Sequence, residues 1–386
     1  MERQQRLELV DALRAFALFG LFIVHMVEQF ELYWLDAQGG DVLHLVLAVF
    51  GGKAFALFAL CFGLSFFIIM DRASQRGVDF RRRFVWRLTL LFGLGLLHTA
   101  VYRGDVLTVL APLGLLLIPF DRIRNNAVLI AIAAVCFLQP QLVAMALAGY
   151  DKPPAFTNDP SLPILATSRN LLEVARLNLT DGAAVKYLYT LETGRVAQII
   201  GLFLTGLVLG RSGFFADQER FALSRRLGFL AALAVYLVLR EERGALLALF
   251  TAGQGATYMG FAVDSWINLS LMFAEMLAFL ELCVWVPLVT RLLAPVGRMT
   301  LSLYVGQSLL FVPVYYGFGL GMYRTLPQIA SLGLGVAAFA VQIAIAHLWF
   351  RRFHFGPLEW AWRSLTYLSR DVPFLRRPQR AQPAPA

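Results

Sequence analysis

Long apolar runs separated by short polar stretches constrain this chain more than any other sequence feature. A helix needs about 20 apolar residues to cross the hydrocarbon core of a bilayer. The chain is 59% hydrophobic and only 15% charged, whereas soluble domains carry about 25% charged residues. The sequence therefore predicts an all-α, polytopic integral membrane helical bundle. About ten transmembrane helices are expected, at approximately residues 12–31, 43–70, 86–102, 105–120, 126–149, 189–210, 226–240, 266–290, 299–318 and 329–350.

The distribution of basic residues predicts an orientation. If the N-terminus is cytoplasmic, 23 of the 34 Lys and Arg residues fall on the cytoplasmic side and nine on the opposite side. An excess of Lys and Arg in cytoplasmic loops sets the orientation of membrane proteins. An even number of spans places both termini on that side, so we expect cytoplasmic N- and C-termini. The membrane also accounts for the net charge of +9, which is therefore no indication of nucleic-acid binding.

The sequence predicts a single transmembrane domain over residues 1–367 and a flexible tail over residues 371–386. The longest stretch outside the apolar runs is an expected outer loop at residues 149–188. It opens with Gly, Pro and Asp residues that break helices, and it continues with ILATSRNLLEVARLNL, whose spacing predicts one amphipathic helix. The loop either packs on the bundle or forms a lid over an outward-facing site. Mixed aromatic and Arg residues predict an interfacial cytoplasmic helix at about residues 356–370.

The first apolar run, Leu13–Phe30, carries ionisable residues, which are costly inside a bilayer. It lacks the features of a cleaved signal and is expected to remain as a span. At about 100° per residue, one face of this helix carries five polar residues and should meet other helices or a water-filled cavity. These are Asp11, Arg14, His25, Glu28 and Gln29.

Each part of this polar face has two interpretations. Asp11 and Arg14 either cap the helix and pair with each other or belong to a functional site. His25 lies about 16 Å beyond Arg14 along the helix axis. It is either a polar contact between helices or a catalytic base or proton relay.

Other candidate site residues lie at the ends of later runs. His98 precedes a YRGD turn that ends in Asp105. Both residues could share an outer vestibule with His25, although packing by His98 and helix capping by Asp105 are alternatives. Arg298 follows Gly297 at the start of the ninth run. That position suits a phosphate of coenzyme A or a membrane anchor. The cysteines lack metal-ligand spacing, so no metal site is expected.

Several motifs together resemble one bacterial membrane family. They reach from Arg6 to Tyr367, and the C-terminal motif is the most specific. They are LVDALRAFALFGLFIVH, LFALCFGLSFFIIMDRASQRG, RRFVWRLTLLFGLGLLHTAVYRGDVLTVLAPLGLLLI, GLFLTGLVLGRSGFF, GRMTLSLYVGQSLL with YYGFGLG, and RFHFGPLEWAWRSLTY. On these motifs the chain is identified as a member of the YeiB-like family (domain of unknown function 418). The resemblance implies a multi-pass protein of the bacterial inner (plasma) membrane.

The first helix is also similar to that of membrane acyltransferases that O-acetylate cell-surface glycans and to that of heparan glucosaminide acetyltransferase. The glycan O-acyltransferases carry an Asp, an Arg three residues later and a functional His eleven residues after the Arg. Asp11, Arg14 and His25 repeat that spacing. The resemblance implies acyl-CoA as the donor substrate, with its phosphates near Arg14 or Arg298. An envelope glycan or lipid would be the acceptor, with His25 as the base and Asp105 and His98 as further candidates.

The ionisable residues also allow other functions. In a transporter or flippase for a small molecule or envelope precursor, the polar face of the first helix would line the path. The absence of a recognisable internal repeat weighs mildly against this hypothesis, because many transporters are built from inverted repeats. A scaffold without turnover is a third alternative. Membrane lipids are expected partners, and the sequence leaves the acceptor, the acyl group and the oligomeric state open.

Overall fold

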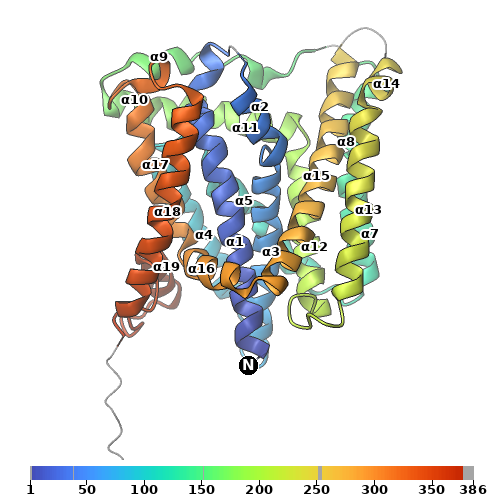
Figure 1. The fold of residues 1–386 in the computed structure, drawn as a ribbon, viewed down its shortest axis with the longest axis vertical. Helices are drawn as coiled ribbons and strands as arrows, with labels where there is room; N and C mark the ends of the chain where they lie inside the picture. Colours follow the sequence, from blue (N-terminus) through green and yellow to red (C-terminus); the bar gives the residue numbers. More distant parts are fainter. Residues whose placement is uncertain (1, 38, 151, 251–253, 377–386) are drawn as a thin grey trace, which may run out of the picture.

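The described chain is a bundle of helices that run between two ends of the molecule (Figure 1). The computed structural model describes residues 2–37, 39–150, 152–250 and 254–376. The longer helices are α1 (Glu2–Val27), α3 (Lys53–Ser74), α4 (Arg81–Thr99), α7 (Asn126–Phe137), α12 (Arg195–Ser212), α13 (Ala222–Glu241), α15 (Gln254–Trp285), α16 (Pro287–Arg298), α17 (Thr300–Tyr315), α18 (Gln328–Arg352) and α19 (Pro357–Tyr367). The shorter ones are η1 (Gln29–Leu35), α2 (Asp41–Val49), α5 (Leu107–Gly114), α6 (Leu117–Asp121), α8 (Pro140–Leu147), η2 (Ala155–Thr157), α9 (Leu162–Thr167), α10 (Leu171–Leu177), η3 (Asn178–Gly182), α11 (Ala183–Glu192), α14 (Arg243–Ala248) and η4 (Met322–Arg324).

The two ends of the bundle are named here by residues of α1. The Arg14 end contains the chain's N-terminus, α16 and α19, and the His25 end contains α2, α9, α10 and α11 (Figure 1). Which end is cytoplasmic remains the prediction made from the basic loops.

Seven segments of the described chain are long and apolar enough to cross a membrane, so the protein is a polytopic helical membrane protein. They are Glu8–Leu35, Asp41–Ser74, Asn126–Leu147, Arg195–Ser212, Ala222–Glu241, Gly255–Trp285 and Gln328–Arg352. Three further spans expected from the sequence correspond to helices that are outside these seven segments. Helix α4 begins with arginines, the segment 105–120 is divided into α5 and α6, and α17 has only 16 residues.

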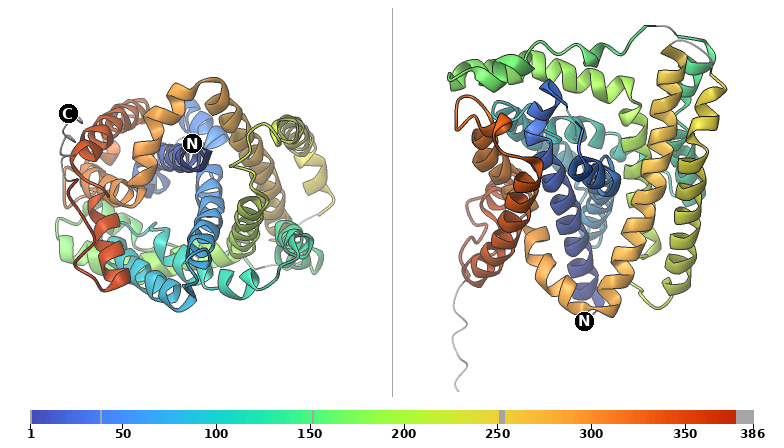
Figure 2. Two further views of the ribbon diagram at one scale, coloured as in Figure 1. Left: turned by 90° about the horizontal axis from the view of Figure 1, so that it is seen from below. Right: turned by 45° about the horizontal axis from the view of Figure 1, so that its top comes forward.

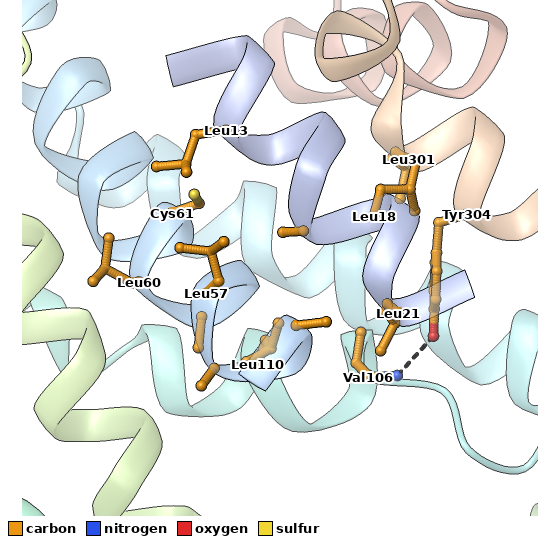
Figure 3. Packing of buried hydrophobic residues seen from close by; sticks show 14 of the residues in the cluster. Leu13, Leu18, Leu21, Leu57, Leu60, Cys61, Val106, Leu110, Leu301 and Tyr304 are labelled. Atoms are coloured by element: carbon orange, nitrogen blue, oxygen red, sulfur yellow. Dashed lines mark hydrogen bonds between the residues drawn. The ribbon is translucent and has the colours of Figure 1, made fainter. Parts of the chain in front are cut away.

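Helix α1 lies inside the ring formed by the other helices (Figure 2). Its apolar side chains Ala12, Leu13, Leu18 and Phe22 are completely buried. Figure 3 shows leucines of α1 packed against Leu57 and Leu60 of α3, Leu110 of α5 and Leu301 of α17. Helices at the edge differ, because α13 exposes leucines along its length, as expected of a lipid-facing surface.

Glycine allows α3 and α12 to pack backbone against backbone. A Cβ atom at Gly63 of α3 would overlap the carbonyl oxygen of Phe203, and one at Gly206 of α12 would overlap the carbonyl oxygen of Leu60. Small residues at such contacts are the usual means by which membrane helices approach closely. This contact fixes the two helices that extend from the His25 end to the Arg14 end.

The first span differs from its expected form at its end. The helix stops at Val27 rather than Phe30, because Phe30 and Glu31 adopt positive φ angles of 50° and 83°. The chain therefore turns back over the end of α1. Gln29 leaves the expected polar face and donates a hydrogen bond of 2.8 Å to the Leu326 carbonyl.

The expected outer loop at residues 149–188 contains more helix than predicted. Instead of one amphipathic helix, α9 ends at Thr167 and α10 begins at Leu171. The break is local, because the Asn170 side chain accepts hydrogen bonds from the Leu172 and Glu173 amides and so caps α10. We call residues 154–192 the covering segment, since it lies over the bundle at the His25 end (Figure 2).

The C-terminal region is more ordered than expected up to residue 376. Helix α19 occupies the place predicted for the interfacial helix, and its location at a membrane surface stays a prediction. The expected flexible tail, residues 371–386, begins with residues that pack. Phe374 contacts the rings of Phe353 and Trp360, and the His354 amide donates to the Phe374 carbonyl. Aromatic side chains thus hold the start of this tail, whose residues 377–386 lie outside the described chain.

The contact between α3 and α12 can be tested with Gly206→Ala. Overpacking a close contact costs about 1–3 kcal/mol, so we expect a lower melting temperature in detergent. Gly260→Ala is the matched control, because no atom lies within 4 Å of a Cβ built at Gly260. Equal melting temperatures for the two variants would contradict the proposed packing.

Candidate functional site

A cavity of about 800 Å³ lies at the His25 end. We call it the His25 cavity. Its walls come from α1, η1, α3, the turn between α4 and α5, the covering segment, α12 and α15. The polar and charged residues lining it include His25, Glu28, Glu31, Arg103, Asp105, Asp159, Lys186, Arg195 and Asn268, and the aromatic ones are Trp34, Phe55, Phe156 and Tyr189. Concave sites with converging polar groups on a mostly apolar wall are typical of small-molecule binding.

A chain of hydrogen bonds joins Glu31, Tyr102 and His25. The Tyr102 hydroxyl donates to Glu31 Oε1 over 2.9 Å, and it lies 3.1 Å from His25 Nδ1. A phenol has one proton to donate, so the proton in the second contact belongs to His25 Nδ1. The neutral imidazole then carries its free lone pair on Nε2. This Nε2 is buried and has no hydrogen-bond partner among the described residues.

Arg103 holds Glu31 in place and links it to the covering segment. Its Nε donates to Glu31 Oε2 over 2.9 Å, and its Nη1 contacts Asp159 and the Ser161 hydroxyl. The Arg103 side chain is only 7% exposed. Burial by itself raises the pKa of Asp159, but Arg103 and the Ser161 donors outweigh it and hold that pKa below its usual range. Asp159 is therefore held in its ionised form, and the contact with Arg103 makes Glu31 a fixed acceptor for Tyr102.

Asp105 serves both roles that were considered for it. Its Oδ2 accepts the Thr108 amide over 2.8 Å at the start of α5, and its Oδ1 lies 2.7 Å from His98 Nδ1. Both side chains are completely buried, but of the two only Asp105 belongs to the lining of the His25 cavity. The predicted outer vestibule thus contains His25 and Asp105 directly, and His98 reaches it through Asp105.

The turn between α4 and α5 is held by residues from distant segments. The Tyr304 hydroxyl of α17 accepts the Val106 amide over 3.0 Å (Figure 3). Asn178 of the covering segment donates to the Ala100 and Val101 carbonyls. Gly104 is required at the centre, because a Cβ there would overlap the Tyr102 hydroxyl and the Glu31 carboxylate.

The residues expected at the other end of the polar face form a separate cluster. Arg14 pairs with Asp11 over 3.5 Å and donates to the Thr300 hydroxyl of α17 over 3.0 Å. Arg298 lies over the Phe350 ring at 4.0 Å and contacts the His354 carbonyl. Asp11, Arg14 and Arg298 are absent from the lining of the His25 cavity. The structure therefore divides the predicted site into two clusters that are separated along α1.

Sequence reasoning did not assign a role to Glu31, Tyr102, Arg103 or Lys186. The YRGD motif was the available signal for two of them, since a polar turn between two apolar runs is unusual. Lys186 donates to the Thr108 hydroxyl over 2.8 Å, next to Asp105. Burial lowers the pKa of Lys186. No motif singled out in the sequence includes Lys186, so only the folded structure reveals its place in the cavity wall.

Two protein families match separate parts of the chain. Residues 6–155 match the family described as heparan-alpha-glucosaminide N-acetyltransferase, catalytic. Residues 209–369 match the family described as protein of unknown function (DUF418). The first match contains Glu31, Tyr102 and His25, so the hydrogen-bonded chain lies wholly in the part similar to an acetyltransferase.

Three bacterial relatives match most of the chain. The uncharacterized protein YxaH of Bacillus subtilis is 29% identical, with 95% of each chain covered. An uncharacterized 39.9 kDa protein from the amylase 3' region of Bacillus acidopullulyticus is 25% identical over 96% of each chain. The uncharacterized protein YeiB of Escherichia coli is 28% identical over 81% of each chain. The resemblance to the YeiB-like family is thereby confirmed: this chain is a distant homologue of YeiB and YxaH, with a DUF418 region and a region like the acetyltransferase catalytic domain.

Proposed function

We propose that the protein is a membrane acyltransferase that moves an acyl group from acyl-CoA to an acceptor in the His25 cavity. The observation that carries the proposal is Nε2 of His25, at the end of the hydrogen-bonded chain from Glu31 through Tyr102, which no described residue contacts by a hydrogen bond. The match of residues 6–155 to an N-acetyltransferase catalytic family supports the same chemistry. The acceptor would be a hydroxyl or amine of an envelope glycan or lipid.

In this mechanism His25 acts as the general base. Its Nε2 takes the proton from the acceptor O–H or N–H group as the acceptor oxygen or nitrogen bonds to the thioester carbonyl carbon. The C–S bond of the donor then breaks, and the proton on Nε2 passes to the departing coenzyme A sulfur. Tyr102 and Glu31 stabilise the imidazolium that forms in between, because Nδ1–H points along the chain toward a carboxylate.

Cytosolic acyl-CoA is the proposed donor substrate, reaching the site from the Arg14 end. Arg14 and Arg298 carry the positive charge proposed for its phosphates, although both already contact protein groups. We further propose ten membrane crossings, with α4, α5 with α6, and α17 added to the seven apolar segments. Both termini would then be cytoplasmic, in the inner membrane of a bacterium, as the basic loops favour.

The charges in the cavity also favour an alternative, a transporter or flippase. Glu28 lines the cavity next to His25 and accepts a hydrogen bond from Trp34 Nε1, yet it has no role in the acyl-transfer mechanism proposed above. Uptake of a substrate into proteoliposomes, without acyl-CoA turnover, would favour transport over transfer.

Acyl-CoA turnover tests the proposed role of His25. We expect purified protein to release coenzyme A from acetyl-CoA in the presence of glucosamine as a surrogate acceptor. His25→Ala should reduce the rate by about 10²-fold or more, the usual contribution of a general base. The control His44→Ala removes an exposed histidine at the same end. Full turnover by His25→Ala would exclude the proposed mechanism.

Tyr102→Phe tests the hydrogen-bonded chain separately from His25. Loss of the hydroxyl removes the partner of Nδ1, so we expect kcat to fall roughly 10- to 100-fold with little change in KM. Tyr33→Phe is the control, since the Tyr33 hydroxyl accepts only the Gly39 amide among the contacts it makes with the described chain. A variant whose KM rises while kcat is unchanged would show that Tyr102 binds substrate instead.

A further inference from the structure

A second cavity lies at the Arg14 end and is not part of the proposed catalytic site. Its volume is about 840 Å³, and it is bounded by the ends of α3 and α12, the start of α4 and the loop between α6 and α7. Four arginines and three carboxylates line it, and we call it the arginine cavity; the charged residues are Arg81, Arg122, Arg124, Arg211, Asp71, Asp79 and Asp121. Phe67, Met70 and Phe80 form an apolar part of its wall.

Two of the four arginines are engaged in holding the cavity together. Arg211 donates to Asp121 Oδ1 over 3.1 Å and to the Asp121 and Ile123 carbonyls. Arg81 lies 3.5 Å from the other oxygen of the same carboxylate. These contacts fix the loop after α6 against α12 and α4, and they pair the Asp121 carboxylate with two arginines.

The other two arginines have no such role. Arg122 and Arg124 are exposed, and neither forms a hydrogen bond or ion pair with the described residues. Arg122 and Arg124 alternate with Asp121 and Ile123, whose carbonyls accept hydrogen bonds from Arg211. The backbone that carries these two side chains is therefore held in place. Unpaired guanidinium groups lining a cavity suit a phosphate, which accepts two parallel hydrogen bonds from one Arg.

We propose that the arginine cavity binds a phosphate-bearing amphiphile, with the phosphate on Arg122 and Arg124 and the apolar part against Phe67 and Met70. Two ligands share this chemistry. One is the headgroup of an anionic phospholipid, and the other is the nucleotide end of an acyl-CoA, which would then lie here rather than at Arg14 and Arg298. The proposal does not rest on acyl transfer, because the second ligand would bind whether or not the protein is an enzyme.

The test compares the double variant Arg122→Gln/Arg124→Gln with the full-length wild type. The control is Arg220→Gln/Arg291→Gln, which removes the same charge from side chains outside the cavity lining. Binding of radiolabelled coenzyme A is measured in detergent, and retention of phosphatidylglycerol is measured by native mass spectrometry. Unchanged melting temperatures would show that both double variants fold.

We expect the cavity variant to lose about tenfold in affinity for one of the two probes, and the control variant to bind like the wild type. Selective loss of coenzyme A binding would assign the cavity to the nucleotide end of acyl-CoA. Selective loss of phosphatidylglycerol would assign it to a lipid headgroup. If both probes bind the cavity variant as they bind the control, the proposal is wrong.

Discussion

Arg103 joins three segments that are distant in sequence, and the geometry of the His25 cavity depends on this one buried guanidinium. It pairs with Glu31 just beyond α1 and with Asp159 in the covering segment. A buried charge is costly unless it is paired and hydrogen-bonded. The three groups therefore hold one another in place, and Glu31 becomes a fixed acceptor. That acceptor orients the Tyr102 hydroxyl, and the hydroxyl in turn decides which nitrogen of His25 carries the proton.

Helix α1 connects the two ends of the molecule through an apolar centre. Its leucines and alanines between Arg14 and His25 are buried, so an apolar stretch separates these two ionisable residues. Arg14 and His25 are separated by about 16 Å along the axis. An acyl group that moved from the Arg14 end to the His25 end would have to cross this distance. Close packing of α3 on α12 gives the surrounding bundle a rigid wall, because glycines bring the two backbones into contact.

The two cavities differ in the way they treat charge. In the His25 cavity, Glu31 and Asp159 both pair with Arg103, and Nε2 of His25 has no hydrogen-bond partner among the described residues. In the arginine cavity, one carboxylate is shared between two arginines, and two further arginines form no hydrogen bond or ion pair within the described part of the chain. The first arrangement suits proton transfer on a bound acceptor, and the second suits the binding of an anion.

The sequence by itself determined the membrane class, most of the long helices and the placing of His25 and Asp105 at one end. Apolar length and the 3.6-residue period carry that information locally. The sequence could not place Glu31 or Lys186 in the His25 cavity, and it could not show that Arg14 and Arg298 lie apart from that cavity. Only the tertiary structure decided these points, because positive φ angles at Phe30 and Glu31 turn the chain back over α1. Long-range contacts such as Arg103 with Asp159 then close the cavity, and no local pattern encodes such pairs.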